Sequence, residues 1–184
     1  VIDTPTMSVL AMAGSQQWGP ETGGFNNGCT ARRSGGSILK PFLYALALEK
    51  GFSASSVISD TLQTFRTPQG DYLPVNADRR SYGPITVRSA LGNSLNITAV
   101  KMLNALGGRT FYRLLASLGL LPPDEALADV YGLGLAIGNP ELSMTSVAAA
   151  YGMLAHAGRR VALRATPGPA SISFEIVSAA TAWI

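Results

Sequence analysis

The fold is decided by the stretch Arg33-Ser34-Gly35-Gly36-Ser37-Ile38-Leu39-Lys40-Pro41-Phe42. In it a serine, Ser37, is followed three residues later by a lysine, Lys40. On a helix this spacing places both side chains on one face, with Cβ atoms about 5–6 Å apart. A hydroxyl and an amine held in this way can act as a nucleophile and its base without a histidine. The stretch therefore predicts a helix that begins at a reactive serine.

The residues after Ser37 predict that this helix is buried. Apolar side chains dominate residues 42–48, and Gly51 ends the pattern. Pro41 is tolerated only near a helix start, because proline lacks an N–H group and clashes with the carbonyl four residues back. We therefore expect the helix to begin at about Ser37. At that position the helix dipole would disfavour an ammonium on Lys40 and favour developing negative charge on the serine.

Length and composition fit one globular domain. The chain has 184 residues, of which 47% are hydrophobic and 14% charged, and its net charge is +3. A chain of this size can bury a core, and its profile is not that of a disordered protein. No segment interleaves basic and aromatic residues on one face, so we do not expect nucleic-acid binding. No apolar run approaches the ~18 residues that a membrane-spanning helix needs.

Cysteine and histidine each occur once, which argues against several kinds of site. Cys29 alone cannot form an internal disulfide, and we interpret it as a structural or idle thiol. His156 alone argues against a zinc site and against a Ser-His-Asp triad. Because it lies near the end of an expected helix, we interpret it as a surface residue that offsets the helix dipole. We expect neither a metal nor a cofactor.

Hydrophobic patterning predicts a mostly helical chain. An apolar run at residues 7–13 is typical of a buried strand, and residues 16–36 are rich in Gly, Asn and Pro, as in a long loop. Residues 52–85 look irregular. Besides the helix at Ser37, helical patterns cover residues 86–91, 97–106, 109–118 and 145–157. A further apolar segment occupies residues 173–184.

A second short motif, Ser94-Leu95-Asn96, lies directly before one of the expected helices. Taken alone, it could be a loop in which Asn96 caps the helix. Likewise Ser37 and Lys40, taken alone, could be an N-cap serine and a surface lysine. Whether these residues carry chemistry therefore depends on the sequence around them.

Three strings resemble one family. They are residues 33–49 around Ser-x-x-Lys, residues 83–100 around Ser-x-Asn, and Tyr131-Gly132-Leu133-Gly134-Leu135-Ala136-Ile137-Gly138 leading into residues 148–151. Ser-x-x-Lys, a Ser-x-Asn element and Lys-Thr-Gly mark the penicillin-recognising serine enzymes. In order and extent the strings are similar to the transpeptidase domain of bifunctional, class A penicillin-binding proteins, nearest the 1C subtype.

The resemblance implies an α+β fold, in which an antiparallel sheet is flanked by helices. The family's Lys-Thr-Gly motif would be expected some tens of residues after Trp183. We therefore expect residues 1–184 to be a single, partial transpeptidase domain that is incomplete at its C-terminus, predominantly helical and marginally stable on its own. A glycosyltransferase domain and a membrane anchor are expected elsewhere in the parent protein. Gly35-Gly36 replaces the family's usual Pro-Gly, and we expect it to loosen the approach to the helix.

The resemblance also implies peptidoglycan D,D-transpeptidation, the cross-linking of the bacterial cell wall. Ser37 would attack a stem peptide that ends in D-Ala-D-Ala, and neutral Lys40 would accept its proton. Ser94 would pass a proton to the leaving amine, and Asn96 would hydrogen-bond the substrate backbone. β-Lactams would acylate Ser37 in the same way. The expected location is extracytoplasmic, on the periplasmic face of the inner membrane.

Two other functions stay open. Without a Lys-Thr-Gly motif the chain could be a catalytically silent penicillin-recognising module, or it could be a serine β-lactamase or D,D-carboxypeptidase on the same fold. Asn139-Pro140-Glu141-Leu142 resembles the loop of the deacylating glutamate in class A β-lactamases. Because this loop precedes the helix expected from Thr145, we interpret Glu141 as a helix-start acid.

Overall fold

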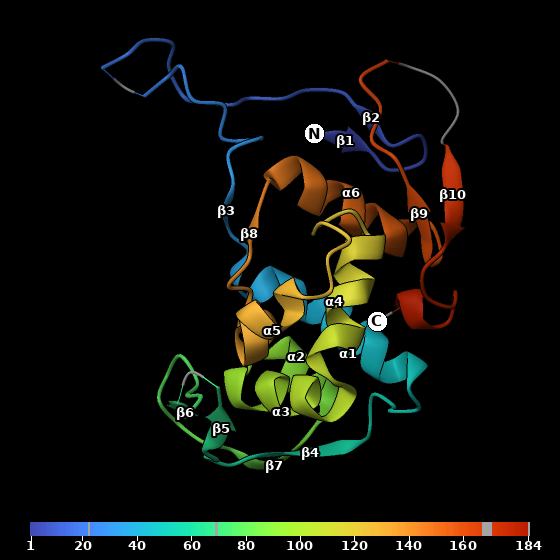
Figure 1. Cartoon of the computed structure of the whole chain (residues 1–184). Coiled ribbons are helices and arrows are strands. Elements are labelled where there is room, and N and C mark those ends of the chain that lie inside the picture. The colour runs from blue at the N-terminus through green and yellow to red at the C-terminus, as the bar shows by residue number, and fades with distance from the viewer. Residues whose placement is uncertain (22, 69, 167–170, 184) are drawn as a thin grey trace. The chain divides into compact units, whose positions relative to one another are not determined.

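The computed structural model describes residues 1–21, 23–68, 70–166 and 171–183 (Figure 1). The chain divides into two compact units, each of which is described on its own. The first unit holds residues 1–34, 115–122 and 141–184, and the second holds residues 35–114 and 123–140. Within the described residues the named strands form two-stranded antiparallel ladders. None of the helices described in these ranges has the length and apolar character to cross a membrane.

The second unit is built around α1 (Lys40–Glu49), which continues from a 3-10 turn, η1 (Gly36–Leu39). α1 packs against α2 (Val87–Gly92) and α3 (Asn96–Leu106), and α3 packs against the 3-10 segment η2 (Gly132–Ile137) (Figure 1). The side chains of α1 are buried all round its axis: Lys40, Phe42, Leu43, Tyr44, Ala45, Leu46 and Ala47. The prediction of a buried helix that starts near Ser37 is confirmed.

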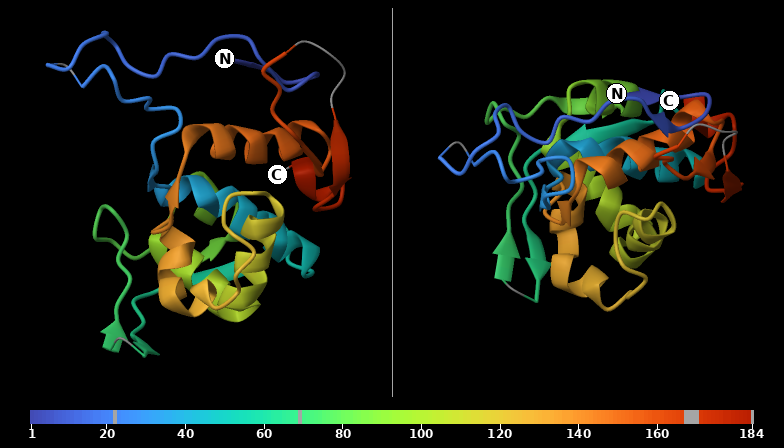
Figure 2. Two further views of the ribbon diagram at one scale, coloured as in Figure 1. Left: turned by 45° about the horizontal axis from the view of Figure 1, so that its top comes forward. Right: turned by 90° about the horizontal axis from the view of Figure 1, so that it is seen from above.

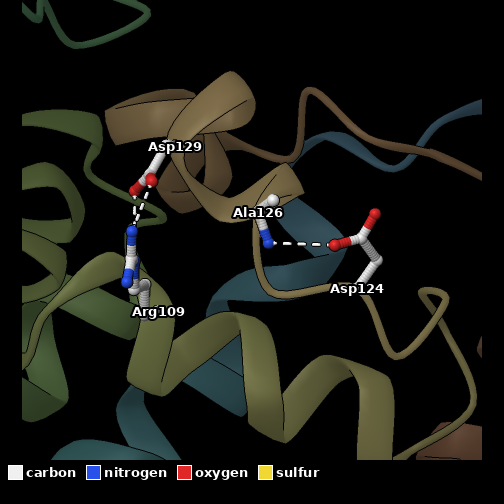
Figure 3. Close-up of polar contacts among 4 residues, drawn as sticks. All are labelled: Arg109, Asp124, Ala126 and Asp129. Atoms are coloured by element: carbon white, nitrogen blue, oxygen red, sulfur yellow. Dashed lines mark hydrogen bonds and ion pairs between the residues drawn. The ribbon is translucent and has the colours of Figure 1, made fainter.

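An exposed ion pair links α4 (Gly108–Ser117), which begins in this unit, to the short α5 (Leu127–Tyr131). Arg109 Nη2 lies 2.6 Å from Asp129 Oδ2, and Arg109 Nε donates to Oδ1 at 3.3 Å (Figure 3). The hydrogen bonds from this guanidinium lower the pKa of Asp129. Since both side chains are largely exposed, the pair contributes little to stability.

The prediction that residues 52–85 are irregular is wrong. β4 (Val57–Asp60) pairs with β7 (Gly83–Thr86), and β5 (Phe65–Thr67) pairs with β6 (Gly70–Tyr72) in a hairpin. In the left view of Figure 2 the hairpin (green) projects from one side of its unit. Strands of three or four residues are too short to show a clear alternation of apolar and polar positions, so the turn residues between them dominated the pattern.

The first unit contains one long helix, α6 (Met144–Ala155), with short ladders. α6 begins at Ser143, whose hydroxyl accepts from the N–H of Ser146 at 3.1 Å, and it packs against β9 and η3. The remaining elements of this unit are β1 (Ile2–Asp3) paired with β2 (Ser8–Val9), β3 (Arg33–Ser34) with β8 (Glu141–Leu142), β9 (Arg159–Val161) with β10 (Ile172–Glu175), and the 3-10 turn η3 (Thr181–Trp183).

Two local predictions in this unit need correction. The strand expected at residues 7–13 is reduced to β2, because the N–H groups of Leu10 and Ala11 both turn to the carbonyl of Val1, at 3.0 and 3.3 Å, and end the ladder. Glu141 lies in β8, and not at a helix start, since Ser143 is the N-cap of α6. The apolar segment 173–184 is divided between β10 and η3, and residue 184 lies outside the described residues.

Candidate active site

Lys40 is fully buried although it carries an amine. Its Nζ donates to the carbonyl oxygen of Ser94, to the hydroxyl of Ser94 at 3.2 Å, and to Oδ1 of Asn96 at 2.7 Å. Burial lowers the pKa of Lys40 from 10.5 to about 8. A useful share of the amine is therefore neutral near physiological pH, as a general base requires. The alternative that Lys40 is a surface lysine is wrong.

Ser37 lies in η1, one turn before Lys40, and is exposed. It is not an N-cap, because Gly35 holds that position for η1 and Leu39 for α1. Among the described residues Nζ of Lys40 is bonded to Ser94 and Asn96, and not to the Ser37 hydroxyl. Contacts between a nucleophile and its base are often long until a substrate is bound. The arrangement thus pairs an accessible hydroxyl with a sheltered amine at one helix start.

The backbone that leads to Ser37 is held by residues far along the chain. Gly35 N–H donates to the carbonyl of Pro140 at 3.0 Å, and Gly36 N–H donates to the carbonyl of Gly138 at 2.9 Å. A Cβ on Gly138 would overlap the carbonyl oxygen of Gly36, and the φ of Gly138 is +77°. Only glycine fits such an approach without strain. These two bonds and the close approach of Gly138 hold the segment that leads to the helix, and the loosening expected from Gly35-Gly36 stays a prediction.

Ser94 occupies a backbone conformation that serine rarely adopts. It follows the C-cap of α2, Asn93, with φ +53°. Its N–H donates to the carbonyl of Leu91 at 2.9 Å, and the next N–H, of Leu95, donates to that of Ala90 at 3.0 Å. These are the two bonds of a Schellman motif, whose left-handed position usually holds glycine. A serine is therefore kept where its local backbone favours another residue, and its side chain contacts Lys40.

Asn96 is the first residue of α3 and does not cap it. The N-cap is Leu95, which offers no side-chain acceptor, so the capping alternative is wrong. The side chain of Asn96 instead lies between Lys40 Nζ and the carbonyl of Val75, to which its Nδ2 donates at 3.0 Å. The structure therefore brings Lys40, Ser94 and Asn96 into direct contact, with Ser37 one turn away on the same helical segment.

Two further polar residues, Asn76 and Asp60, lie behind this cluster and were missed in the sequence. Both are buried, with exposed fractions of 2% and 0%. Asn76 accepts from the N–H groups of Asn96 and Ile97 and donates to Asp60 Oδ2. Both lie in residues 52–85, where the sequence has no apolar periodicity that would predict buried positions. The one available hint was an aspartate at the end of the short apolar run of β4.

The remaining candidates lie in the other unit. His156 is the C-cap of α6, and its Nε2 is 2.7 Å from the carbonyl oxygen of Thr4. Cys29 is buried, with Sγ 3.3 Å from the carbonyl oxygen of Ala13. Within the described ranges, no group of three or more His, Cys, Asp or Glu side chains is arranged to hold a metal ion.

Comparison with known proteins identifies the family. The profile of the penicillin binding protein transpeptidase domain matches residues 1–169. Penicillin-binding protein 1C of Escherichia coli (strain K12) is 34% identical over 100% of this chain and 24% of its own length. Penicillin-binding protein 1A of Neisseria gonorrhoeae is 33% identical over 87% of this chain and 20% of its own. The chain thus spans a quarter or less of the length of these relatives.

Solved structures agree with this fold. Penicillin-binding protein 1A from Haemophilus influenzae, 28% identical, superposes with a TM-score of 0.69 over 85% of this chain and 24% of that chain. The transpeptidase domain of Burkholderia pseudomallei penicillin-binding protein 3 gives 0.75 over 98% of this chain and 57% of that chain, but at 21% identity it shows the fold alone. The α+β transpeptidase fold is confirmed. Because the family profile covers residues 1–169, and a relative is 34% identical over 100% of this chain, the chain belongs to the transpeptidase family of the penicillin-binding proteins.

Proposed function

We propose that this chain carries the acyl-serine machinery of a peptidoglycan D,D-transpeptidase that cross-links the cell wall and binds penicillin. The observation that supports this most is the fully buried Lys40, three residues after the exposed Ser37 and bonded to Ser94 and Asn96. Burying an amine costs folding free energy, and here burial lowers its pKa and favours the neutral form. Groups with pKa values perturbed in this way are found most often at functional sites. The family membership supplies the reaction class.

In the proposed reaction Ser37 Oγ attacks the carbonyl of a stem peptide that ends in D-Ala-D-Ala, and its proton passes to neutral Lys40. The oxyanion forms beside η1, where the first N–H groups of a helical segment have no partner within it. Ser94, 3.2 Å from Lys40 Nζ, relays a proton from the ammonium to the departing D-alanine amine. The amine of a neighbouring stem peptide then attacks the Ser37 ester and releases the enzyme.

Asn96 has a different proposed part in this scheme. Its Oδ1 accepts from Lys40, and its Nδ2 from the same amide donates to the Val75 carbonyl. The side chain is therefore held at the edge of the cluster, where it can exchange its contact with Val75 for one with a substrate peptide group. β-Lactams, which imitate the dipeptide, would meet the same groups. The parent protein is proposed to act outside the cytoplasmic membrane, where stem peptides occur, together with a membrane anchor and a glycosyltransferase domain.

Labelling with a fluorescent penicillin tests the proposal on the protein expressed at the full length of its gene. We expect one adduct, which mass spectrometry locates on Ser37, and no labelling of Ser37→Ala. Ser34→Ala, an exposed serine three residues earlier, is the matched control and should label normally. An adduct on another residue, or full labelling of Ser37→Ala, would refute the assignment. Rapid hydrolysis of the adduct would instead indicate a β-lactamase.

A further inference from the structure

The N-terminus of α3 is capped by a residue from outside the helix. The first backbone N–H groups of a helix lack partners within it, and the N-cap side chain usually satisfies one of them. Leu95 cannot do so. Instead Asn76, in the segment between β6 and β7, accepts through its Oδ1 from the N–H of Asn96 at 2.8 Å and from that of Ile97 at 3.2 Å. The position of the first turn of α3 thus depends on Asn76.

Asp60 determines which way the Asn76 amide faces. Asn76 Nδ2 donates to Asp60 Oδ2 at 2.8 Å and to the carbonyl of Arg80 at 2.9 Å. Asp60 Oδ2 also accepts from the N–H of Tyr82 at 2.9 Å. With the amide reversed, Oδ1 would face a carboxyl and a carbonyl oxygen, and Nδ2 would face two N–H donors. The buried carboxyl group at the end of β4 therefore keeps the oxygen of Asn76 aimed at α3.

The first turn of α3 in turn places the partners of Lys40. Asn96 is its first residue, and Ser94 precedes its N-cap by one position. Both contact Lys40 Nζ. A shift of this turn by about 1 Å would break those contacts, and displacements of that size are known to lower rates strongly. It would also open the lysine to water.

We infer that Asn76 and Asp60 are positioning residues for acylation of Ser37: they hold Asn96 and Ser94 against Lys40 through the cap of α3. The inference rests on the proposed function, since it assigns a role within that reaction. Neither residue contacts the reacting atoms. Their effect reaches Lys40 through hydrogen bonds and through the packing that keeps its amine dry.

The test measures two quantities in the protein at the full length of its gene: the rate of labelling by a fluorescent penicillin from pH 6 to 11, and the titration of Lys40 by NMR of ¹³C-labelled lysine. In the wild type both should have a midpoint at about pH 8. In Asn76→Ala we expect labelling at pH 8 to fall at least tenfold and both midpoints to move by a unit or more toward 10.5, because the amine gains water.

Three further variants and one control complete the test. Asp60→Asn keeps the volume and an oxygen acceptor, so its effect should be smaller than that of Asp60→Ala and in the same direction. Asn76→Asp keeps the acceptor for α3 but loses the donor to Asp60 and faces it with a second carboxyl, so its labelling at pH 8 should also fall below that of the wild type. Met102→Ala truncates a buried side chain of the same helix away from the network, and it should lower the melting temperature without moving either midpoint.

The outcomes separate the two claims. If the wild type labels at Ser37 and the Asn76 and Asp60 variants keep both midpoints, the inference is refuted while the proposed function stands. If the wild type does not label at Ser37, the proposed function is refuted, and the NMR titration alone decides whether the network controls Lys40. If Asn76→Ala does not fold, Asp60→Asn carries the same measurement.

Discussion

Replacing Ser94 by glycine should stabilise the fold and impair the reaction. Ser94 takes the left-handed position of a Schellman motif with φ +53°. For a residue with a Cβ this conformation costs roughly 1–2 kcal/mol, and glycine avoids that cost, although it loses more backbone entropy on folding. The expected net gain in the free energy of unfolding is about 1 kcal/mol, or about 2–4 °C in melting temperature for a domain of this size.

The rate of acylation, in contrast to the stability, should fall in Ser94→Gly. Ser94→Gly removes the hydroxyl 3.2 Å from Lys40 Nζ and leaves the backbone contact from Nζ to residue 94 in place. The proposed proton relay is then lost, whereas the base is kept. We expect the labelling rate with a fluorescent penicillin to fall by about 10²–10⁴, the range typical of a positioned proton donor.

A matched control exists at the other end of the chain. Ala157 follows the C-cap of α6 with φ +51°, and the N–H of Gly158 donates to the carbonyl of Met153 at 2.9 Å, as in the α2 motif. Ala157→Gly should therefore raise the melting temperature by a similar amount and leave labelling unchanged. Melting curves and labelling time courses of both variants are the measurements. If Ser94→Gly melts lower than the wild type, or labels at the wild-type rate, the reasoning about this position is wrong.

Three other predictions concern the base and the approach to the serine. Lys40→Arg should abolish labelling although the charge is kept, because a guanidinium does not lose its proton in a protein; near-normal rates in this variant would mean that another group is the base. With a Lys40 pKa of about 8, the neutral fraction should rise about tenfold from pH 7 to pH 9, and the labelling rate with it; a rate that is flat over this range would contradict the assignment. Gly138→Ala should destabilise the fold by more than about 2 kcal/mol, since the new Cβ overlaps Gly36 at a positive φ; an unchanged melting temperature would show that the approach can move.

The same lowered pKa gives the stability of the fold a defined pH dependence. In the folded chain Lys40 loses its proton at about pH 8, and in the unfolded chain near 10.5. Between these values the unfolded state binds more protons, so the free energy of unfolding should rise with pH in this window and level off above it. In Lys40→Met the rise due to this residue should be absent.

Helices were predictable from the sequence and short strands were not. The ranges 86–91, 97–106, 109–118 and 145–157 agree with α2, α3, α4 and α6 within two residues, because each carries a sustained apolar period. α5 and η2 were missed. η2 contains glycines at 132 and 134, and because glycine has a low helix propensity the sequence did not indicate a helical turn there. The turn is stabilised by its packing against α3.

The candidate site was predictable only as far as its motifs. Ser37, Lys40, Ser94 and Asn96 were singled out by spacing and by resemblance. In the structure Ser94 and Asn96 contact the amine of Lys40. Asn76 could not be found in this way, since it follows an irregular-looking segment and caps a helix 20 positions later. A cap of this kind is set by tertiary contact, which local sequence patterns do not record.

Three local rules are broken among Lys40 and the two residues whose side chains contact its amine, Ser94 and Asn96. A lysine is buried, a serine takes a left-handed position, and a helix starts without a cap of its own. Each of these exceptions lowers the free energy of unfolding by an amount similar to the effect of a typical destabilising point mutation. The buried Asn76–Asp60 pair offsets the third and has no apolar alternative, because the N–H groups of Asn96 and Ile97 need an acceptor. Departures that cluster at one group and are supported by a buried polar pair are typical of a site shaped for reaction. A core shaped for stability alone would have an apolar side chain in place of Lys40.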